Sequence, residues 1–448
     1  MPQTAQSIYR QFWHFALPTI AAMIVSGLYQ VVDGIFIGHY IGAQGLAGIN
    51  LAWPMVGAIY GIGMLVGIGT GAKSSIKLGE KKLNEAKVTL STGLLMLLLV
   101  APIISVLLFF FSNDFLALQG ANGESFIFAT QYLQVLLFAN PFALGSIAIP
   151  FLLRNDGSPN FATLLMVIGA ITNIGFDYIF IAHFSWGLKG AAIATSIAQC
   201  IVCVVGIGYF FSAKANMRLS RASLRVNFAD ITGIIAIGAS SFFMYVYGAF
   251  MVAVHNKLFA QYGDPTLVGA YAILGYIFFS YYLFSEGVAN AMQPLVSFNH
   301  GAGKPENIRK LLSVAICCTI FGGIAFVGLL NTFPEQFIAI FNSQDKVLME
   351  YAVAGIRLHL FALFLDGFLV VAAAYYQSIN RGSKATFVTV GNMLVQLPFL
   401  YFMPKLIGVT GIWLSYPLSN IALSLVVIFM FYFDIKNKLS PDALDESL

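Results

Sequence analysis

Four carboxylic acids lie inside apolar runs that are long enough to cross a bilayer, at Asp33, Asp177, Glu286 and Asp366. A charged side chain at the centre of a membrane helix costs about 2.5–3.5 kcal/mol on the scale measured for helix insertion. Sequences therefore retain such side chains mainly where they bind a proton, an ion or a charged ligand, or where they pair with another helix. These four residues are the first candidates for chemistry.

Two of the four acids have nearly the same predicted depth. Asp33 lies about five residues, and Asp177 about six, before the outer end of its run, which at ~1.5 Å per residue places both in the outer half of the membrane. Asn173 shares a helix face with Asp177, and Tyr132 enters another run at a similar level. We therefore expect Asp33, Asn173, Asp177 and Tyr132 to line one pocket. The alternative is that they are satisfied contacts between helices, or that Asp177 reaches the interface.

Such a pocket could bind a coupling ion. Two carboxylates that share a low-dielectric site cannot both ionise easily, so one of them would hold a proton. A proton or Na⁺ that enters through the full membrane potential releases roughly 2.3 kcal/mol per 100 mV. The expected pocket could therefore link ion entry to the uphill export of a solute.

The other two acids lie in the second half of the chain, and each is followed by a glycine, Gly287 or Gly367. Glu286 and Asp366 could bind a cationic substrate, form a second coupling site, or bond to the backbone beside these glycines. Pro18 lies in the same run as Asp33 and removes one backbone hydrogen bond. The first helix therefore has a place to bend, or alternatively a static kink.

The elements that position these residues follow from composition. The chain has 448 residues, of which 59% are hydrophobic and 9% charged, whereas soluble domains carry about a quarter charged residues. At roughly 20 residues for each span, we expect an all-α integral membrane protein of about twelve transmembrane helices. The expected spans are 13–38, 46–71, 88–112, 128–152, 160–182, 188–211, 231–256, 267–296, 310–332, 351–379, 386–404 and 409–434.

Basic residues set the expected orientation. Lys and Arg crowd the connections within 73–87 and 214–225 and are sparse on the opposite side, so these connections should be cytoplasmic. Both termini are then cytoplasmic, and the short tails suit the inner (plasma) membrane of a bacterium. The first twelve residues lack the pattern of a removable signal peptide, so we expect the first run to remain as a helix.

The chain contains an internal repeat. Asn155-Asp156-Gly157-Ser158 after the fourth expected span is echoed by Asn380-Arg381-Gly382-Ser383 after the tenth. Six spans return the chain to its starting side, so two six-helix lobes would be related by a parallel pseudo-two-fold axis. We expect an N-terminal lobe at 1–211, a cytoplasmic linker at 212–230, a C-terminal lobe at 231–434 and a cytoplasmic tail at 435–448.

Several local patterns resemble the multidrug and toxic compound extrusion (MATE) family. The stretch Val31–Gly38, with Pro18 before it, is similar to the first helix of the family, and Gln293–Gly303 is similar to the stretch that ends its eighth helix. Asn173 with Asp177 resembles the fifth-helix pair of the prokaryotic DinF-like branch. The resemblance covers essentially the whole chain.

This resemblance implies two six-helix lobes around a V-shaped cavity and antiport of H⁺ or Na⁺ against amphipathic, often cationic, drugs. It assigns the coupling site to Asp33, Asn173 and Asp177, with Tyr132 at the position of a tyrosine in that pocket. It also implies that protonation bends the first helix at Pro18. Asp366 lies about one turn from the acid expected in the Na⁺-coupled branch, which favours protons over Na⁺.

The sequence thus predicts a secondary active multidrug efflux transporter that exchanges H⁺ for amphipathic organic compounds by alternating access. The alternatives are a Na⁺-coupled drug antiporter, or a flippase of lipid-linked oligosaccharide on a related fold, for which several cavity arginines would be expected. The chain lacks nucleotide-loop, zinc-protease and nucleophile-elbow motifs, so we expect no enzyme. We further expect drug-like substrates and membrane lipids as partners, no nucleic acid, no cofactor besides the coupling ion, no metal, and a monomer.

Overall fold

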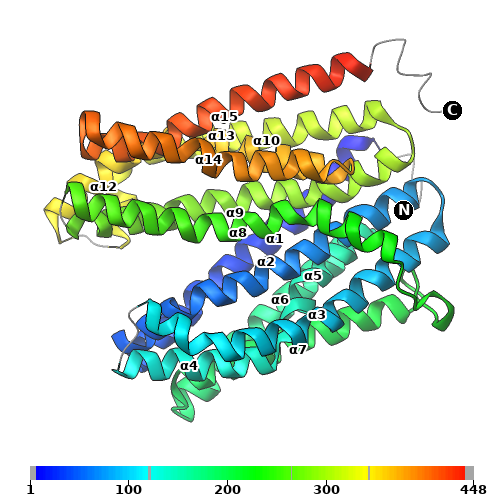
Figure 1. Ribbon diagram of the computed structural model, residues 1–448, viewed down its shortest axis with the longest axis horizontal. Helices are drawn as coiled ribbons and strands as arrows, with labels where there is room; N and C mark the ends of the chain where they lie inside the picture. The colour runs from blue at the N-terminus through cyan, green and yellow to red at the C-terminus, as the bar shows by residue number, and fades with distance from the viewer. Residues whose placement is uncertain (1–6, 120–122, 264, 342–343, 439–448) are drawn as a thin grey trace. The chain divides into compact units, whose positions relative to one another are not determined.

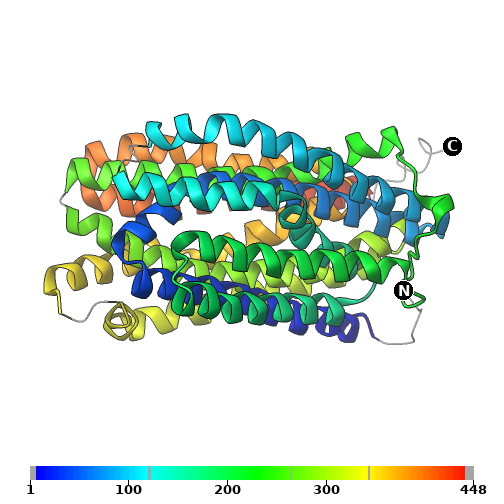
Figure 2. The same cartoon turned by 90° about the horizontal axis from the view of Figure 1, so that it is seen from below.

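The computed structural model of the chain describes residues 7–119, 123–263, 265–341 and 344–438. In that part of the chain every regular element is a helix (Figures 1 and 2). The elements are α1 (Ile8–Tyr40), α2 (Ala43–Gly79), α3 (Leu83–Leu118), α4 (Gly123–Phe138), α5 (Asn140–Asn155), α6 (Pro159–Asp177), the π-helix η1 (Tyr178–His183), α7 (Gly187–Phe211), the 3-10 turn η2 (Arg221–Ser223), α8 (Phe228–Tyr262), α9 (Pro265–Gly301), α10 (Pro305–Thr332), α11 (Pro334–Ala339), α12 (Lys346–His359), α13 (Leu363–Ser378), α14 (Gly382–Ile407) and α15 (Val409–Lys438).

Most of these helices can cross a membrane. Within the described residues, ten are long and apolar enough by themselves, and two bent pairs raise the number of spans to as many as twelve. The bent pairs are α4 with α5, at 68°, and α12 with α13, at 52°. The prediction of an all-α membrane protein with about twelve spans is therefore confirmed. Each bent pair replaces the fourth expected span of its half, so the break itself is repeated.

The first break has a local cause. Pro141 lies in the first turn of α5, where its missing amide hydrogen is tolerated, but α4 could not continue through it. The Asn140 side chain donates from Nδ2 to the Ala101 carbonyl of α3 at 2.9 Å and so attaches the break to the neighbouring helix. Continuous hydropathy over 128–152 had predicted one unbroken helix here.

The surface of α3 is that of a helix in contact with lipid. Phe110 is 71% exposed, and Phe109 and Phe111 beside it are also exposed. A row of exposed phenylalanines would be unfavourable in water and is ordinary on a membrane helix. The apolar runs that predicted the spans therefore supply both the packed interior and the lipid-facing surface.

The chain divides into two compact units. Unit 1 comprises Met1–Ala249, Glu286–Ala315 and Ala374–Ala385, and unit 2 comprises Phe250–Ser285, Ile316–Ala373 and Thr386–Leu448. Unit 1 thus contains the first half of the chain together with parts of α8, α9, α10, α13 and α14. The lobe boundaries at 1–211, 212–230 and 231–434 stay a prediction, and residues 439–448 of the expected tail lie outside the described residues.

Within unit 1, α2 packs backbone to backbone against the second half of the chain. A Cβ atom at Gly69 would collide with the carbonyl oxygen of Ile234 in α8, and one at Gly301 in α9 would collide with that of Ile76 in α2. Small residues allow such close approach between membrane helices. These contacts join the two sequence halves inside one packed body.

The start of α8 is attached to α2 and α3 by ion pairs. Asp230 is buried, with a side chain that is 4% exposed, and its Oδ1 lies 3.1 Å from Nζ of both Lys73 and Lys77. Thr89 of α3 donates its hydroxyl to Oδ2 of Asp230 at 2.8 Å. The three donors therefore fix the point where the expected linker enters the second half.

Candidate functional site

The structure brings Asp33 and Asp177 together in unit 1. Asp33 is half-buried on α1, and Asp177 is the fully buried last residue of α6, which packs along α1. Their carboxyl groups are close enough to interact electrostatically. Apart from the other acid of the pair, no described residue hydrogen-bonds either oxygen of Asp177 or Oδ1 of Asp33. Burying a carboxylate without a donor is strongly unfavourable, so this pair is suited to hold a proton or a cation.

Asn173 adds a further acceptor on the same helix. It lies one turn before Asp177, is 2% exposed, and donates from Nδ2 to the hydroxyl of Thr195 in α7 at 3.2 Å. Its Oδ1 atom has no hydrogen-bond partner within the described part of the chain. The Asn173 amide is thus oriented by Thr195 and presents a free oxygen, as the hydrogen-bond network assigns it.

Three tyrosines lie around the acid pair. Tyr132 of α4 is buried and interacts electrostatically with both Asp33 and Asp177. Tyr29 of α1 and Tyr60 of α2 also lie near Asp33. Sequence reasoning missed these two. Tyr29 precedes Asp33 by one helical turn and could have been found from that spacing, whereas Tyr60 comes from another helix and has no spacing signal.

The helix geometry changes directly after Asp177. α6 ends there, and the next six residues form the π-helix η1. Single π-helical turns within α-helices are often found at functional sites. The segment is fixed by ring stacking, because Phe180 lies 4.9 Å from Trp186 and 5.3 Å from Phe176 between ring centroids. The helix expected over 160–182 is therefore present as one span, Pro159–His183, but it changes from α- to π-helical at the candidate site.

Pro18 lies within α1, which the structure shows as one helix from Ile8 to Tyr40. The hydroxyl of Thr163 in α6 donates to the Pro18 carbonyl at 2.8 Å. On the other side, a Cβ atom at Gly287 of α9 would lie only 2.9 Å from Cα of Ile20. Helices α6 and α9 thus contact α1 at and just after Pro18. Bending at Pro18 stays a prediction.

Glu286 lies on α9, in the part of that helix that belongs to unit 1. It is 7% exposed and interacts electrostatically with Arg154 of α5, which is fully buried. The guanidinium of Arg154 lies 5.5 Å from the centroid of the Phe151 ring, and its Nε and Nη1 have no hydrogen-bond partner among the described residues. The sequence did not indicate this buried cation, because a basic residue at the end of a span usually lies in water.

Asp366 belongs to unit 2. Its Oδ1 accepts a hydrogen bond from the Tyr416 hydroxyl of α15 at 2.8 Å, and its Oδ2 has no partner in the described residues. The Tyr416 ring lies 4.9 Å from that of His359 between centroids. Glu286 and Asp366 therefore lie in separate units, each with its own partner, and their predicted roles in binding or coupling stay predictions.

Comparison with known proteins assigns the family. A sequence model of the MatE family matches residues 18–179 and 231–402, one stretch in each half of the chain. The multidrug export protein MepA of Staphylococcus saprophyticus is 25% identical over 441 residues, which is 97% of this chain and 96% of that protein. MepA of Staphylococcus aureus strain NCTC 8325 is 24% identical over 453 residues, at 97% and 96% coverage.

Solved structures show the same fold. An outward-facing MATE family transporter of the MOP superfamily superimposes with a TM-score of 0.92 at 22% identity and covers 97% of both chains. The MATE multidrug transporter DinF-BH, solved as a complex, has a TM-score of 0.89 at 26% identity and covers 97% of this chain and 98% of its own.

Proposed function

The chain belongs to the MatE family of multidrug transporters, a class without enzymatic activity, and from this premise we propose that it exchanges H⁺ for amphipathic, often cationic, organic compounds. Transport would proceed by alternating access in the inner membrane, with both termini in the cytoplasm. The observation that carries the proposal is the Asp33–Asp177 pair, in which Oδ1 of Asp33 and both oxygens of Asp177 are buried without a donor from the described residues.

Burial and mutual repulsion make the acid pair a proton-binding site. Asp177 is fully buried, and ionising both carboxyl groups would place two negative charges beside each other in a low-dielectric site. The pair therefore holds at least one proton whenever no cation compensates it. Tyr132 lies near both acids and can donate a hydrogen bond to whichever one is ionised.

Coupling follows from competition for the pair. A bound proton neutralises the site and removes its attraction for a cationic substrate, whereas loss of the proton restores that attraction. Protonation from the outside would favour release of the substrate there, and deprotonation towards the cytoplasm would favour renewed loading. The proton that enters supplies the energy, so no cofactor is needed beyond the coupling ion.

Na⁺ is the second candidate for the coupling ion. Na⁺ binds through oxygen ligands, and Asp33, Asn173 and Asp177 all carry an oxygen without a hydrogen-bond partner in the described chain. A flippase of lipid-linked oligosaccharide is less well supported, because it would need arginines that are free to bind a diphosphate. The buried Arg154 interacts with the acid Glu286 instead. Drug-like compounds and bilayer lipids remain the proposed partners, and a monomer the proposed state.

The test is transport of a fluorescent cationic drug in proteoliposomes, with either an imposed pH gradient or an imposed Na⁺ gradient. We expect the pH gradient alone to drive uptake, and Asp33→Asn and Asp177→Asn each to lower the rate at least tenfold. Asp114→Asn changes an exposed acid of α3 and is the matched control, expected to retain the rate. Transport driven only by Na⁺, or unchanged in both variants, would refute proton coupling at this site.

A further inference from the structure

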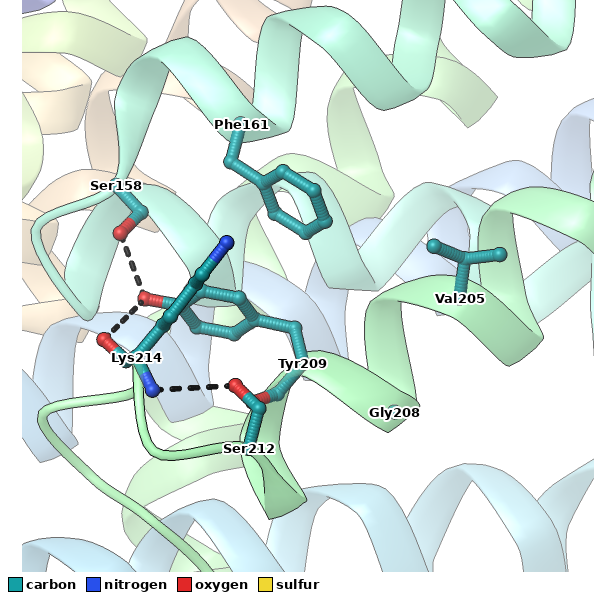
Figure 3. Close-up of a pocket in the computed structure, with 7 residues that line it drawn as sticks. All are labelled: Ser158, Phe161, Val205, Gly208, Tyr209, Ser212 and Lys214. Atoms are coloured by element: carbon teal, nitrogen blue, oxygen red, sulfur yellow. Dashed lines mark hydrogen bonds between the residues drawn. The ribbon is translucent and has the colours of Figure 1, made fainter.

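A groove lies in unit 1 where α6 begins and α7 ends (Figure 3). Its volume is about 520 Å³. The lining combines one cation and three hydroxyl groups with small and apolar side chains, from Ser158, Phe161, Val205, Gly208, Tyr209, Ser212 and Lys214. By the expected topology this end of α7 faces the cytoplasm.

The Asn155–Ser158 turn, whose echo in the second half is Asn380–Ser383, builds one wall of the groove. Asp156 of this turn is buried and accepts hydrogen bonds from the Met217 amide at 2.6 Å and from the Tyr209 hydroxyl at 2.8 Å. Its neighbour Ser158 lies 2.6 Å from the same hydroxyl, oxygen to oxygen. The turn thus fixes both Tyr209 and the start of the expected linker, which carries Lys214.

The backbone of Lys214 is held while its ammonium group stays free. Figure 3 shows the Lys214 carbonyl bonded to the Tyr209 hydroxyl and the Lys214 amide bonded to Ser212. Within the described part of the chain, no hydrogen bond or ion pair engages Nζ of Lys214. Residues 212–229 also contain Arg218, Arg221 and Arg225 and no acid, so the segment that carries Lys214 is basic.

The apolar side of the groove continues onto a lipid-facing surface. Val205 is 45% exposed and Val204 beside it is 55% exposed, on a helix that crosses the membrane. Gly208 leaves open space on this face, because an added Cβ atom would meet no atom within 4 Å. Phe161 stacks on Tyr209 with ring centroids 5.1 Å apart and closes the inner wall.

We propose that this groove binds one anionic phospholipid of the cytoplasmic leaflet. The ammonium group of Lys214 contacts the phosphodiester, and the first carbons of an acyl chain lie along Gly208 and Val205. The charge favours an anionic over a zwitterionic headgroup, since a basic residue near a membrane surface contributes roughly fivefold in affinity for anionic lipid. The site lies on the lipid-facing side of the first half and is separate from the acid pair.

Lipid binding to the full chain can be measured by native mass spectrometry in detergent, with phosphatidylglycerol and phosphatidylcholine titrated in parallel. We expect one phosphatidylglycerol to bind in preference to phosphatidylcholine, with about fivefold weaker binding for Lys214→Gln and retained binding for Lys214→Arg. Gly208→Leu places a large side chain in the groove and should remove this preference, although its Cβ atom meets no atom within 4 Å.

Two controls make the site falsifiable. Lys310→Gln removes an exposed lysine on the same expected side of the membrane, at α10, and should leave binding unchanged. Equal loss in Lys310→Gln and Lys214→Gln would mean diffuse attraction and would overturn the proposal, as would unchanged binding in Gly208→Leu. Competition by soluble glycerol phosphate at the concentration of the lipid would show that the groove accepts a free anion and would equally overturn it.

Discussion

Asp230 offers a quantitative test of how the second half is attached to the first. The change is Asp230→Asn, which keeps the shape and one acceptor but removes the charge that Lys73 and Lys77 share. Hydrogen bonds to charged groups contribute about 1.5–3 kcal/mol each, and Asp230 receives three donors at 2.8 to 3.1 Å. Because the two lysine side chains are 20% and 15% exposed, water can take over part of their solvation. We therefore expect a loss of about 2–3 kcal/mol in the free energy of unfolding.

The assay is reversible unfolding in mixed micelles titrated with a denaturing detergent, combined with a double-mutant cycle. The coupling of Asp230 to Lys77 should exceed its coupling to Lys73, since Lys77 contacts both carboxylate oxygens at 3.1 Å. The matched control is Glu80→Gln, which breaks the exposed pair of Glu80 and Lys82, 2.9 Å apart, and should not move the unfolding midpoint. If Asp230→Asn is no more destabilising than Glu80→Gln, burial does not strengthen this ion pair and the reasoning fails.

Three further changes test other parts of the structure. Gly301→Ala places a methyl group against the Ile76 carbonyl and should lower the unfolding midpoint markedly. The control is Gly57→Ala, whose added methyl group meets no atom within 4 Å and should leave the midpoint unchanged. Equal midpoints for the two variants would disprove the close packing of α2 on α9. Arg154→Met leaves Glu286 buried without a counter-charge and should lower the free energy of unfolding by about 3–5 kcal/mol. Most of this loss should be recovered in the double variant Arg154→Met with Glu286→Gln. A double variant as unstable as the single one would show that the two charges do not compensate each other. Thr195→Val removes the hydrogen bond that orients the Asn173 amide and should weaken drug binding severalfold. The control is Ser196→Ala, because the Ser196 hydroxyl bonds to the Ala192 carbonyl of its own helix and its loss should leave drug binding unchanged. Equal effects of the two variants would exclude a positioning role for Thr195.

The spans could be predicted because hydropathy and length decide whether a helix crosses a membrane. The predicted ranges therefore correspond to the observed helices, but the breaks within them were missed. Residues 128–152 and 351–379 are each apolar enough on average to be predicted as one span, and hydropathy does not reveal that α4 turns into α5 or that α12 turns into α13. Hydropathy also missed the π-helix after Asp177, because a π-helix differs from an α-helix only in which backbone carbonyl each amide hydrogen-bonds.

The candidate site was predictable where one helix carries the information. Their expected depth along two helices predicted that Asp33 lies near Asp177, and helical spacing predicted that Asn173 shares a face with Asp177. Thr195 and Tyr60 could not be found, because they reach the site from other helices whose rotation is set by packing.

The central claim, that substrate and proton compete for Asp33 and Asp177, is tested most directly by proton release on substrate binding. Purified protein in weakly buffered detergent solution, mixed with a cationic drug, would be followed with a pH indicator. The account predicts release of about one proton for each drug bound, and none from Asp177→Asn. Saturable drug binding without proton release, in the absence of Na⁺, would contradict it.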